Sequence, residues 1–285
     1  MAMDAPDVAA RGSPPAPGQT VYRYPLPVRI SHWLNLLILL TLLGSGLQIF
    51  NAHPALYWGS RSDPDRALLS MAARRTTDGS LEGVTTVLGH EFVTTGVLGA
   101  SKGPSGRVEN RGFPAWATIP SSRWLAMGRR WHFFFAWLLV INGLVYVGYS
   151  LACRRHRREL FPNRGELRAL GRSLRTHLHP GALRSEAARG YNVLQKLSYV
   201  IVVFGVLPLV ILTGLTMSPW LDSAFPWLLD LFDGRQSART LHFVGALALV
   251  LFTVVHVAML LLVGPVNHLR AMITGRLRVP QEERS

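Results

Sequence analysis

The chain has 285 residues, of which 49% are hydrophobic and 16% are charged, and its formal net charge is +14. A charged fraction well below the roughly 25% of soluble domains, with the apolar residues gathered in a few runs, indicates a membrane protein. The basic residues stand beside those runs, as membrane topology requires, so the charge does not indicate nucleic-acid binding. The single cysteine, Cys153, excludes a disulfide framework, a four-thiolate iron–sulfur cluster in this chain and covalent haem attachment through Cys-x-x-Cys-His.

Four apolar runs are long enough to cross a bilayer as helices, which takes about 20 residues. Residues 1–20 are rich in Pro, Ala and Gly and are predicted to be a disordered cytoplasmic segment without a cleavable signal peptide. One transmembrane domain is predicted over residues 21–275, followed by a cytoplasmic tail. Its spans are expected at residues 28–50, 131–153, 197–217 and 240–263, and the tail at 276–285. The predicted fold class is therefore an all-α membrane protein, a bundle of four transmembrane helices.

The connections between the spans predict their orientation. Residues 154–196 carry eleven Lys or Arg against three Glu, and this connection is short enough for the positive-inside rule, so we expect it to be cytoplasmic. Residues 218–239 carry three Asp against two Arg, which fits the outer side. Both termini are then predicted to be cytoplasmic.

One connection is unusually long. Residues 51–130 separate the first two spans and are predicted to form a periplasmic loop rich in Gly, Pro, Ser and Thr. Loops of this length are usually functional or disordered. The aromatic side chains of Trp58, Phe113 and Trp116 favour partial order, either as a cap over the bundle or as a platform for a partner.

Four histidines lie within or at the edges of the predicted spans, namely His32, His132, His242 and His256. The last two share one span and are fourteen residues apart, which returns them to within roughly 40° of the same face, about 21 Å apart along the axis. The topology places His32 and His256 near the cytoplasmic surface, and His132 and His242 near the outer surface. Each pair can supply two axial nitrogens to an iron between antiparallel helices, as in other bundle-core cofactor sites.

Two haems bound in this way would transfer electrons. A single histidine in a membrane can instead hydrogen-bond a neighbouring helix, but four at two matched depths favour a cofactor. Bis-imidazole ligation leaves no open axial position for oxygen or substrate. Arg29, Arg130 and Arg239 stand close before these histidines and suit haem propionates, although basic residues at membrane edges also serve topology alone.

Two motifs carry a resemblance to a known family, and a third group of segments points to one branch of it. The motifs are Tyr24-Pro-Leu-Pro-Val-Arg29-Ile-Ser-His32-Trp33 and the His242…His256 spacing. Over about residues 21–275 the chain resembles the bacterial di-haem cytochrome b561 subunits of the nickel–iron hydrogenase type, which also serve formate dehydrogenase. Within this family, the sequence is most similar to the branch called thiosulfate reductase cytochrome b subunit. The segments that carry this similarity are residues 45–59, Phe113-Pro-Ala-Trp116 and Arg130-Trp-His132-Phe-Phe.

This resemblance implies two non-covalent haem b groups at the four histidines and electron transfer to a membrane quinone. It also implies a periplasmic oxidoreductase partner of the molybdopterin or hydrogenase type. The long first outer loop, which shorter members lack, leaves the partner's identity open. We therefore expect an electron-transfer subunit of a respiratory oxidoreductase complex rather than a catalytic subunit. The alternatives are a stand-alone membrane oxidoreductase acting on superoxide or ferric iron at an exposed haem edge, and a transporter or passive anchor without haem.

Overall fold

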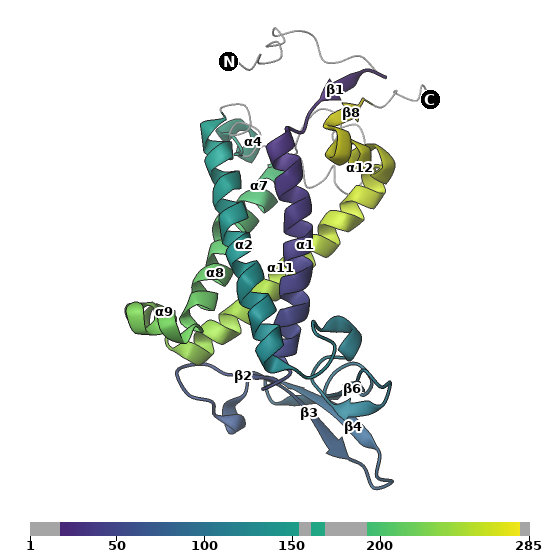
Figure 1. Ribbon diagram of the computed structural model, residues 1–285, viewed down its shortest axis with the longest axis vertical. Helices are drawn as coiled ribbons and strands as arrows, with labels where there is room; N and C mark the ends of the chain where they lie inside the picture. Colours follow the sequence, from purple (N-terminus) through teal and green to yellow (C-terminus); the bar gives the residue numbers. More distant parts are fainter. Residues whose placement is uncertain (1–17, 154–160, 169–192, 280–285) are drawn as a thin grey trace. The chain divides into compact units, whose positions relative to one another are not determined.

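The computed structural model describes residues 18–153, 161–168 and 193–279 (Figure 1). The helices are α1 (Leu26–Phe50), α2 (Leu125–Ala152), α4 (Arg164–Arg168), α7 (Val193–Ile201), α8 (Leu207–Thr216), α9 (Pro219–Ala224), α10 (Trp227–Leu231), α11 (Arg235–Val263) and α12 (Pro265–Thr274). The strands are β1 (Thr20–Tyr22), β2 (Ala55–Leu56), β3 (Leu69–Arg75), β4 (Leu81–Val87), β5 (His90–Val93), β6 (Ala100–Lys102), β7 (Val108–Asn110) and β8 (Arg276–Arg278). Short turns of other helix types are η1 (Pro64–Arg66), η2 (Ala115–Ala117) and η3 (Val202–Val206).

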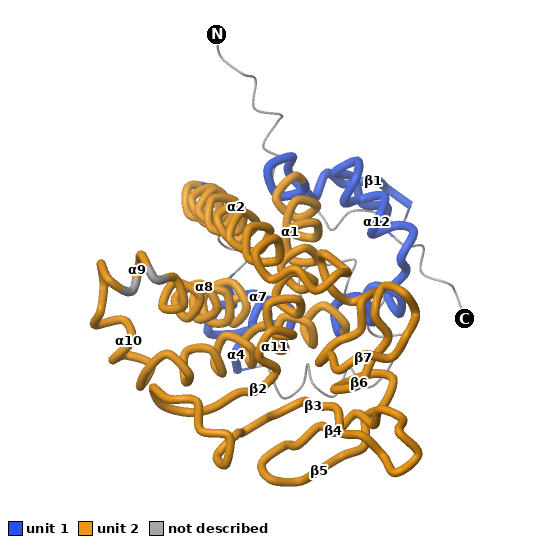
Figure 2. The backbone as a smooth tube through the Cα atoms, turned by 60° about the horizontal axis from the view of Figure 1, so that its bottom comes forward, with its two compact units in different colours: residues 1–29, 153–199, 255–285 blue, residues 30–152, 200–254 orange. Residues whose placement is uncertain are grey.

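The chain divides into two compact units, which are coloured separately in Figure 2. Unit 1 contains residues 1–29, 153–199 and 255–285, and unit 2 contains residues 30–152 and 200–254. Parts of three predicted segments lie outside the described residues. These parts are residues 1–17 of the N-terminal segment, 154–160 and 169–192 of the basic connection, and 280–285 of the tail.

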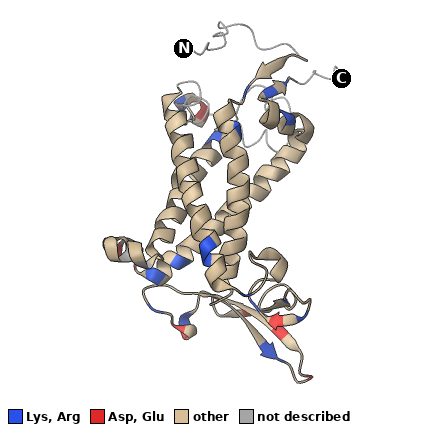
Figure 3. Ribbon diagram, in the orientation of Figure 1, with Lys and Arg blue, Asp and Glu red and all other residues tan. Residues whose placement is uncertain are grey.

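Within the residues that the structure describes, four helical segments are long and apolar enough to cross a membrane, which confirms the predicted fold class. They are Leu26–Phe50, Leu125–Ala152, Val193–Thr216 and Arg235–Val263. The second and fourth begin several residues before the predicted spans, because the backbone stays helical through arginine-bearing first turns that an apolar pattern leaves out. In Figure 3, where the ribbon is coloured at charged residues, the colour lies toward the ends of these long helices and their middle stretches are tan.

Unit 2 has a small core that joins α1, α2 and α8. Ile38 of α1 packs with Phe135 of α2, and Leu207 of α8 contacts this cluster. Asn142 of α2 adds a polar link, because its Nδ2 donates to the Ser31 carbonyl of α1 at 3.1 Å. Side-chain amides hold membrane helices together in this way, because the surrounding hydrocarbon offers them no other partner.

One face of α11 remains exposed in unit 2 and is entirely aliphatic. Val244, Leu247, Leu251 and Val254 are each more than half exposed. They are spaced three or four residues apart and therefore form a single stripe along the helix. Such a stripe is unfavourable in water and suits contact with lipid chains.

The long connection between α1 and α2 folds into β-structure, which the sequence analysis did not predict. Strands β2, β3, β4 and β5 form an antiparallel sheet in that order, and β6 pairs with β7. Val87 pairs with His90, so only Leu88 and Gly89 join β4 to β5, and their φ angles are +49° and +83°. Positive φ at both turn positions is the type I′ geometry, whose twist matches that of paired strands. We call residues 51–124 the β region.

The third span contains a π turn at η3. The Leu207 N–H donates to the Val202 carbonyl, five residues earlier. This turn directly precedes Pro208, which has no N–H to donate to a carbonyl in the preceding turn. A π turn is a common way for a helix to absorb such an interruption.

Unit 1 has its own local order. Strands β1 and β8 pair antiparallel, with Val21 opposite Leu277, so the predicted disordered segment and the predicted tail each contribute residues to a strand. In α4, Asn163 and Glu166 exchange backbone-to-side-chain hydrogen bonds in a capping box, and Lys196 Nζ lies 2.9 Å from the Glu166 carboxylate.

Candidate functional site

The structure brings two of the four predicted ligand histidines together within unit 2. His132 lies in the first three turns of α2, and His242 lies in the first three turns of α11. Their ring centroids are 6.1 Å apart and their planes are inclined at 62°. Both rings are half-buried. These two histidines were predicted to form one site because both lie near the outer ends of their membrane spans.

Ser45 of α1 orients the ring of His132. Its Oγ lies 3.1 Å from Nδ1 of His132 and donates its only proton to the Thr41 carbonyl at 2.6 Å. The hydroxyl must therefore accept a hydrogen bond from the Nδ1–H of His132. This tautomer leaves the lone pair on Nε2, the nitrogen that can then bind a metal.

Helix α8 orients the ring of His242 in the same manner. Its Nδ1 lies 2.9 Å from the Val210 carbonyl and 3.2 Å from Thr213 Oγ1. A carbonyl can only accept, and the Thr213 hydroxyl already donates to the Leu209 carbonyl at 2.7 Å, so Nδ1 of His242 carries the proton. Metal-binding histidines are usually oriented by such a bond from the second ring nitrogen.

A glycine follows each of these hydroxyl residues and allows the ring to approach the helix. A Cβ at Gly46 would lie 3.3 Å from Cε1 of His132, and one at Gly214 would lie 3.2 Å from Cε1 of His242. We call Ser45-Gly46 and Thr213-Gly214 the hydroxyl–glycine pairs. These pairs are not among the residues predicted from the sequence. Their signal is a small hydroxyl residue followed by glycine within an apolar span, a composition typical of close helix contacts.

The geometry of the His132–His242 pair fits a haem iron. Two imidazoles on opposite sides of one metal ion, each bound at ~2 Å, place their ring centroids roughly 6 Å apart. The separation in the structure is 6.1 Å. Within the described ranges, no group of three or more His, Cys, Asp or Glu side chains could hold a metal ion. Two histidines with free Nε2 lone pairs suit a metal whose remaining ligands belong to a macrocycle.

The first part of the β region holds the start of α11, and thereby His242, in place. The Gly59 carbonyl accepts hydrogen bonds from two backbone N–H groups in the first turn of α11, at 3.0 and 3.2 Å. These donors have no partner within the helix itself. Thr240 Oγ1, one turn further along, donates to the Tyr57 carbonyl at 2.6 Å.

The last part of the β region binds the end of α1 next to Ser45. The Ile119 N–H donates to the Gly44 carbonyl at 3.0 Å, and Gln48 Nε2 donates to the Ser122 carbonyl at 2.9 Å. A Cβ at Gly44 would lie 2.7 Å from Ile119 Cγ1, so this close approach requires glycine. One short stretch of α1 therefore contacts both the β region and His132.

Arg111, which is buried inside the β region, links the last part of that region to the end of α1. It is 1% exposed, and it donates to the Phe113 carbonyl at 2.8 Å and to Thr118 Oγ1 and the Ser121 carbonyl at 2.7 Å each. Its Nη2 also lies 3.4 Å from Gln48 Oε1 of α1. Burial lowers the pKa of Arg111. This arginine is a structural cross-link rather than a surface charge that reports membrane topology.

The other two predicted ligands are His32 and His256. His32 lies in unit 2, near the start of α1, and its ring is 5.4 Å from that of Trp33. His256 lies in unit 1, on α11, fourteen residues after His242. The pairing of His32 with His256 stays a prediction.

The predicted propionate partners have different local surroundings. Arg239 Nη2 donates to the His53 carbonyl, and its guanidinium lies 5.5 Å from the ring centroid of Phe50. Arg130 is exposed on α2. Arg29 lines a pocket in unit 1. Their contacts with haem propionates stay predictions.

We expect Ser45→Ala to weaken haem retention at the His132–His242 site by about tenfold or more, the range typical of losing a partner of a metal-bound histidine. Haem transfer from the purified protein to an excess of apo-globin would measure this. Ser150→Ala is the matched control, because Ser150 is 2% exposed and donates to a carbonyl four residues earlier at 2.7 Å. Equal release from the two variants would contradict the orienting role of Ser45.

Comparison with known proteins adds a family and one relative. The family described as prokaryotic cytochrome b561 matches residues 23–275. The chain is 38% identical over 152 residues to a protein of Azospira oryzae named "Putative protein-methionine-sulfoxide reductase subunit YedZ1". The matched part is 53% of this chain and 73% of that relative. No solved structure matches.

Proposed function

The chain belongs to the prokaryotic cytochrome b561 family, and from that premise we propose that it carries electrons through two b-type haems between an oxidoreductase partner and the membrane quinone pool. Family membership implies a cytochrome b that transfers electrons within the membrane. That there are two haems, that a quinone exchanges electrons with them and that an oxidoreductase is the partner are our proposals.

The observation that carries the proposal is the His132–His242 pair. Two rings 6.1 Å apart, each with Nδ1 bonded to the protein and Nε2 available, are prepared to bind one iron from opposite sides. When bound, a haem supplies one-electron transfer at such a site. The protein's part is to fix both rings and to leave no axial position for oxygen or substrate.

We propose a second haem between His32 and His256. The support is positional, because His256 follows His242 by fourteen residues on α11, about 21 Å along a helix axis. His32 is the seventh residue of α1, near the end of that span that the positive-inside rule assigns to the cytoplasm. Helix α11 would then contribute one ligand to each haem, and electrons would cross the membrane along it.

We propose that both termini are cytoplasmic and that the β region is periplasmic. The support is the excess of basic residues over residues 154–196, which the positive-inside rule assigns to the cytoplasm. The His132–His242 haem would then lie on the periplasmic side, beneath the β region, and the His32–His256 haem would lie on the cytoplasmic side.

The proposed partner is a periplasmic oxidoreductase of the molybdopterin type. One relative carries the name of a sulfoxide reductase subunit, which favours a partner of that chemistry over a hydrogenase. We propose that it docks on the β region, where β5 is an edge strand with every residue exposed. Phe92 and Val93 on this strand are 55% and 64% exposed, and apolar edge residues are suited to a protein contact.

The proposed function is tested with a quinol. We propose that the quinone binds beside the His32–His256 haem, on the cytoplasmic side. We therefore expect a short-chain quinol analogue to reduce the haems of the purified, oxidised protein under anaerobic conditions, and His256→Ala to slow this at least about tenfold. Stopped-flow absorbance of the reduced haem band gives the rates. Dithionite, which needs no quinone site, is the control reductant.

Two results would overturn parts of the proposal. If the quinol reduces neither haem while dithionite reduces both, the quinone assignment is wrong. For the partner, methionine sulfoxide added to native membranes together with their periplasmic fraction should reoxidise the reduced haems. Failure of this step alone would reject a sulfoxide reductase as the partner.

A further inference from the structure

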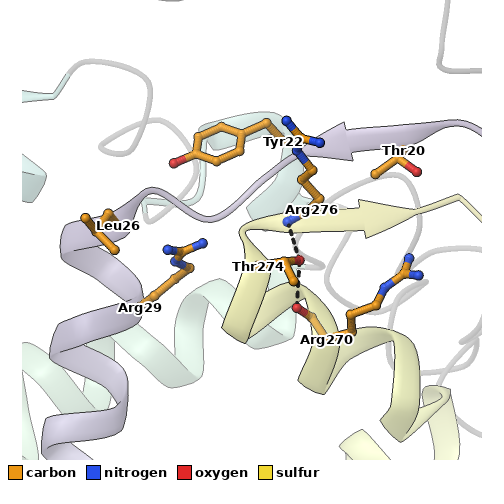
Figure 4. A pocket seen from close by; sticks show the side chains of 7 residues that line it. All are labelled: Thr20, Tyr22, Leu26, Arg29, Arg270, Thr274 and Arg276. Carbon is orange, nitrogen blue, oxygen red and sulfur yellow. Dashed lines mark hydrogen bonds between the residues drawn. The ribbon is translucent and has the colours of Figure 1, made fainter.

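Unit 1 contains an arginine-lined pocket of ≈ 670 Å³ (Figure 4). Only one of its residues, Arg29, is among the predicted propionate partners. Strand β1, the first turn of α1, the end of α12 and strand β8 surround it. Its lining residues are Thr20, Tyr22, Leu26, Arg29, Arg270, Thr274 and Arg276. Three of the seven are arginines and none is acidic. We call it the arginine pocket.

The arginines of this pocket lack counter-charges. Within the described ranges, no carboxylate lies within ion-pair distance of Arg29, Arg270 or Arg276. Arg29 Nε is also buried without a hydrogen-bond partner in the structure. Buried donors almost always have a partner, so an orphaned guanidinium nitrogen indicates a missing acceptor. The pocket therefore presents positive charge and a free donor to an anion.

Local structure holds the arginines in place. Thr274 Oγ1 donates to the Arg270 carbonyl at 2.8 Å and accepts from the Arg276 N–H at 3.2 Å, which joins the end of α12 to β8. The turn between them is Gly275, with φ +83°, where a Cβ would lie 2.8 Å from Arg29 Nη1. Only glycine permits both this backbone conformation and the approach of the Arg29 guanidinium.

The surroundings of Arg270 point to a ligand from the membrane. Val266, Leu269 and Ile273 of α12 are 79%, 41% and 64% exposed, and their spacing places them on the same face as Arg270. A short helix with an exposed apolar face that also carries an arginine suits the boundary between headgroups and acyl chains. Basic pockets beside membrane spans are suited to anionic headgroups.

We propose that the arginine pocket binds a phosphate group, supplied by the headgroup of an anionic phospholipid. Guanidinium groups match phosphate oxygens with paired hydrogen bonds, and three of them around one pocket would attract one phosphate and orient it. The acyl chains would lie along the exposed apolar face of α12. Free phosphate has the same chemistry, and the test separates the two sources.

The test uses the full-length, haem-loaded protein in detergent. Native mass spectrometry would count retained phosphatidylglycerol and phosphatidylcholine after mixing with each lipid. We expect a clear preference for phosphatidylglycerol, and about thirtyfold weaker retention in the double variant Arg270→Gln/Arg276→Gln, since each basic residue near a membrane surface strengthens anionic-lipid binding roughly fivefold. Arg278→Gln is the matched control, because Arg278 is an exposed arginine of the same strand outside the pocket.

A second arm titrates inorganic phosphate into the lipid-free protein by calorimetry. Phosphate binding that the double variant abolishes, without a preference among lipids, would support the phosphate site and identify free phosphate as its ligand. No phosphatidylglycerol preference and no phosphate binding, or equal effects of the double variant and Arg278→Gln, would overturn the proposal. An unchanged haem spectrum in each variant verifies folding, so failure here leaves the electron-transfer proposal intact.

Discussion

His242→Ala is expected to remove one haem and to leave the other, so that the haem-to-protein ratio falls from about two to about one. The variant deletes one predicted axial ligand of the His132–His242 site. His132 then lacks the opposing imidazole, whose ring centroid lies 6.1 Å from its own. His256→Ala should also remove one haem, but the other one. The pyridine haemochrome assay gives the ratio, and reduced-minus-oxidised spectra at low temperature should show a different band lost in each variant.

His90→Ala provides the control for these variants. His90 is an exposed histidine on β5, so its removal should leave the ratio at the wild-type value. An unchanged ratio in His242→Ala would show that the His132–His242 pair is not a haem site. Loss of both haems in a variant that still folds would show that the two sites are not independent.

Arg111→Ala is expected to destabilise the β region by roughly 3–5 kcal/mol, the sum expected when several buried hydrogen bonds to a charged group are lost together. The substitution removes the Arg111 donor from the Ser121 carbonyl and the Thr118 hydroxyl, and it leaves the Phe113 carbonyl with only the Asn51 Nδ2 donor at 3.2 Å. The Ile119 contact with Gly44 lies in the same segment, so the end of α1 should loosen with it. Limited proteolysis across a urea series would report the opening of residues 51–124.

Arg107→Ala is the matched control, because Arg107 is an exposed arginine of the hairpin between β6 and β7. We expect it to change the stability of the β region by less than about 0.5 kcal/mol, as is usual for surface positions. Similar proteolysis midpoints for the two variants would mean that Arg111 does not hold the β region to α1.

The four spans could be predicted from the sequence because hydrocarbon imposes one simple rule, a long run of apolar residues. The ends of the helices could not, since α2 starts at Leu125 and continues through Arg129 and Arg130 before the apolar run begins. Helical hydrogen bonding does not stop where hydropathy changes. Hydropathy therefore predicts the membrane-embedded part of a helix rather than its whole length.

The β region was missed for a different physical reason. Its longer strands, β3 and β4, lack a clear alternation of apolar and polar residues, and β5 is exposed at all four positions. Pairing there depends on the turn at Leu88 and Gly89, and a leucine with positive φ is not a turn signal in sequence. Burial of Arg111 also goes against the usual expectation for a charged residue.

For the site, the sequence predicted the histidines but not what orients them. Depth in the membrane follows from position along a span, which is why His132 and His242 could be paired. The hydroxyl–glycine pairs come from other helices, and Ser45 is 87 residues from His132 in the chain. Serine or threonine before glycine is too common in apolar spans to be specific without the fold.

Electron paramagnetic resonance of the oxidised, purified protein, combined with the haem-to-protein ratio, tests most directly whether this chain holds two bis-histidine haems. We predict a ratio of about two and two low-spin ferric signals, without a high-spin signal, because imidazoles occupy both axial positions of each iron. A ratio near one, or a substantial high-spin signal from an iron with an open axial position, would contradict this prediction.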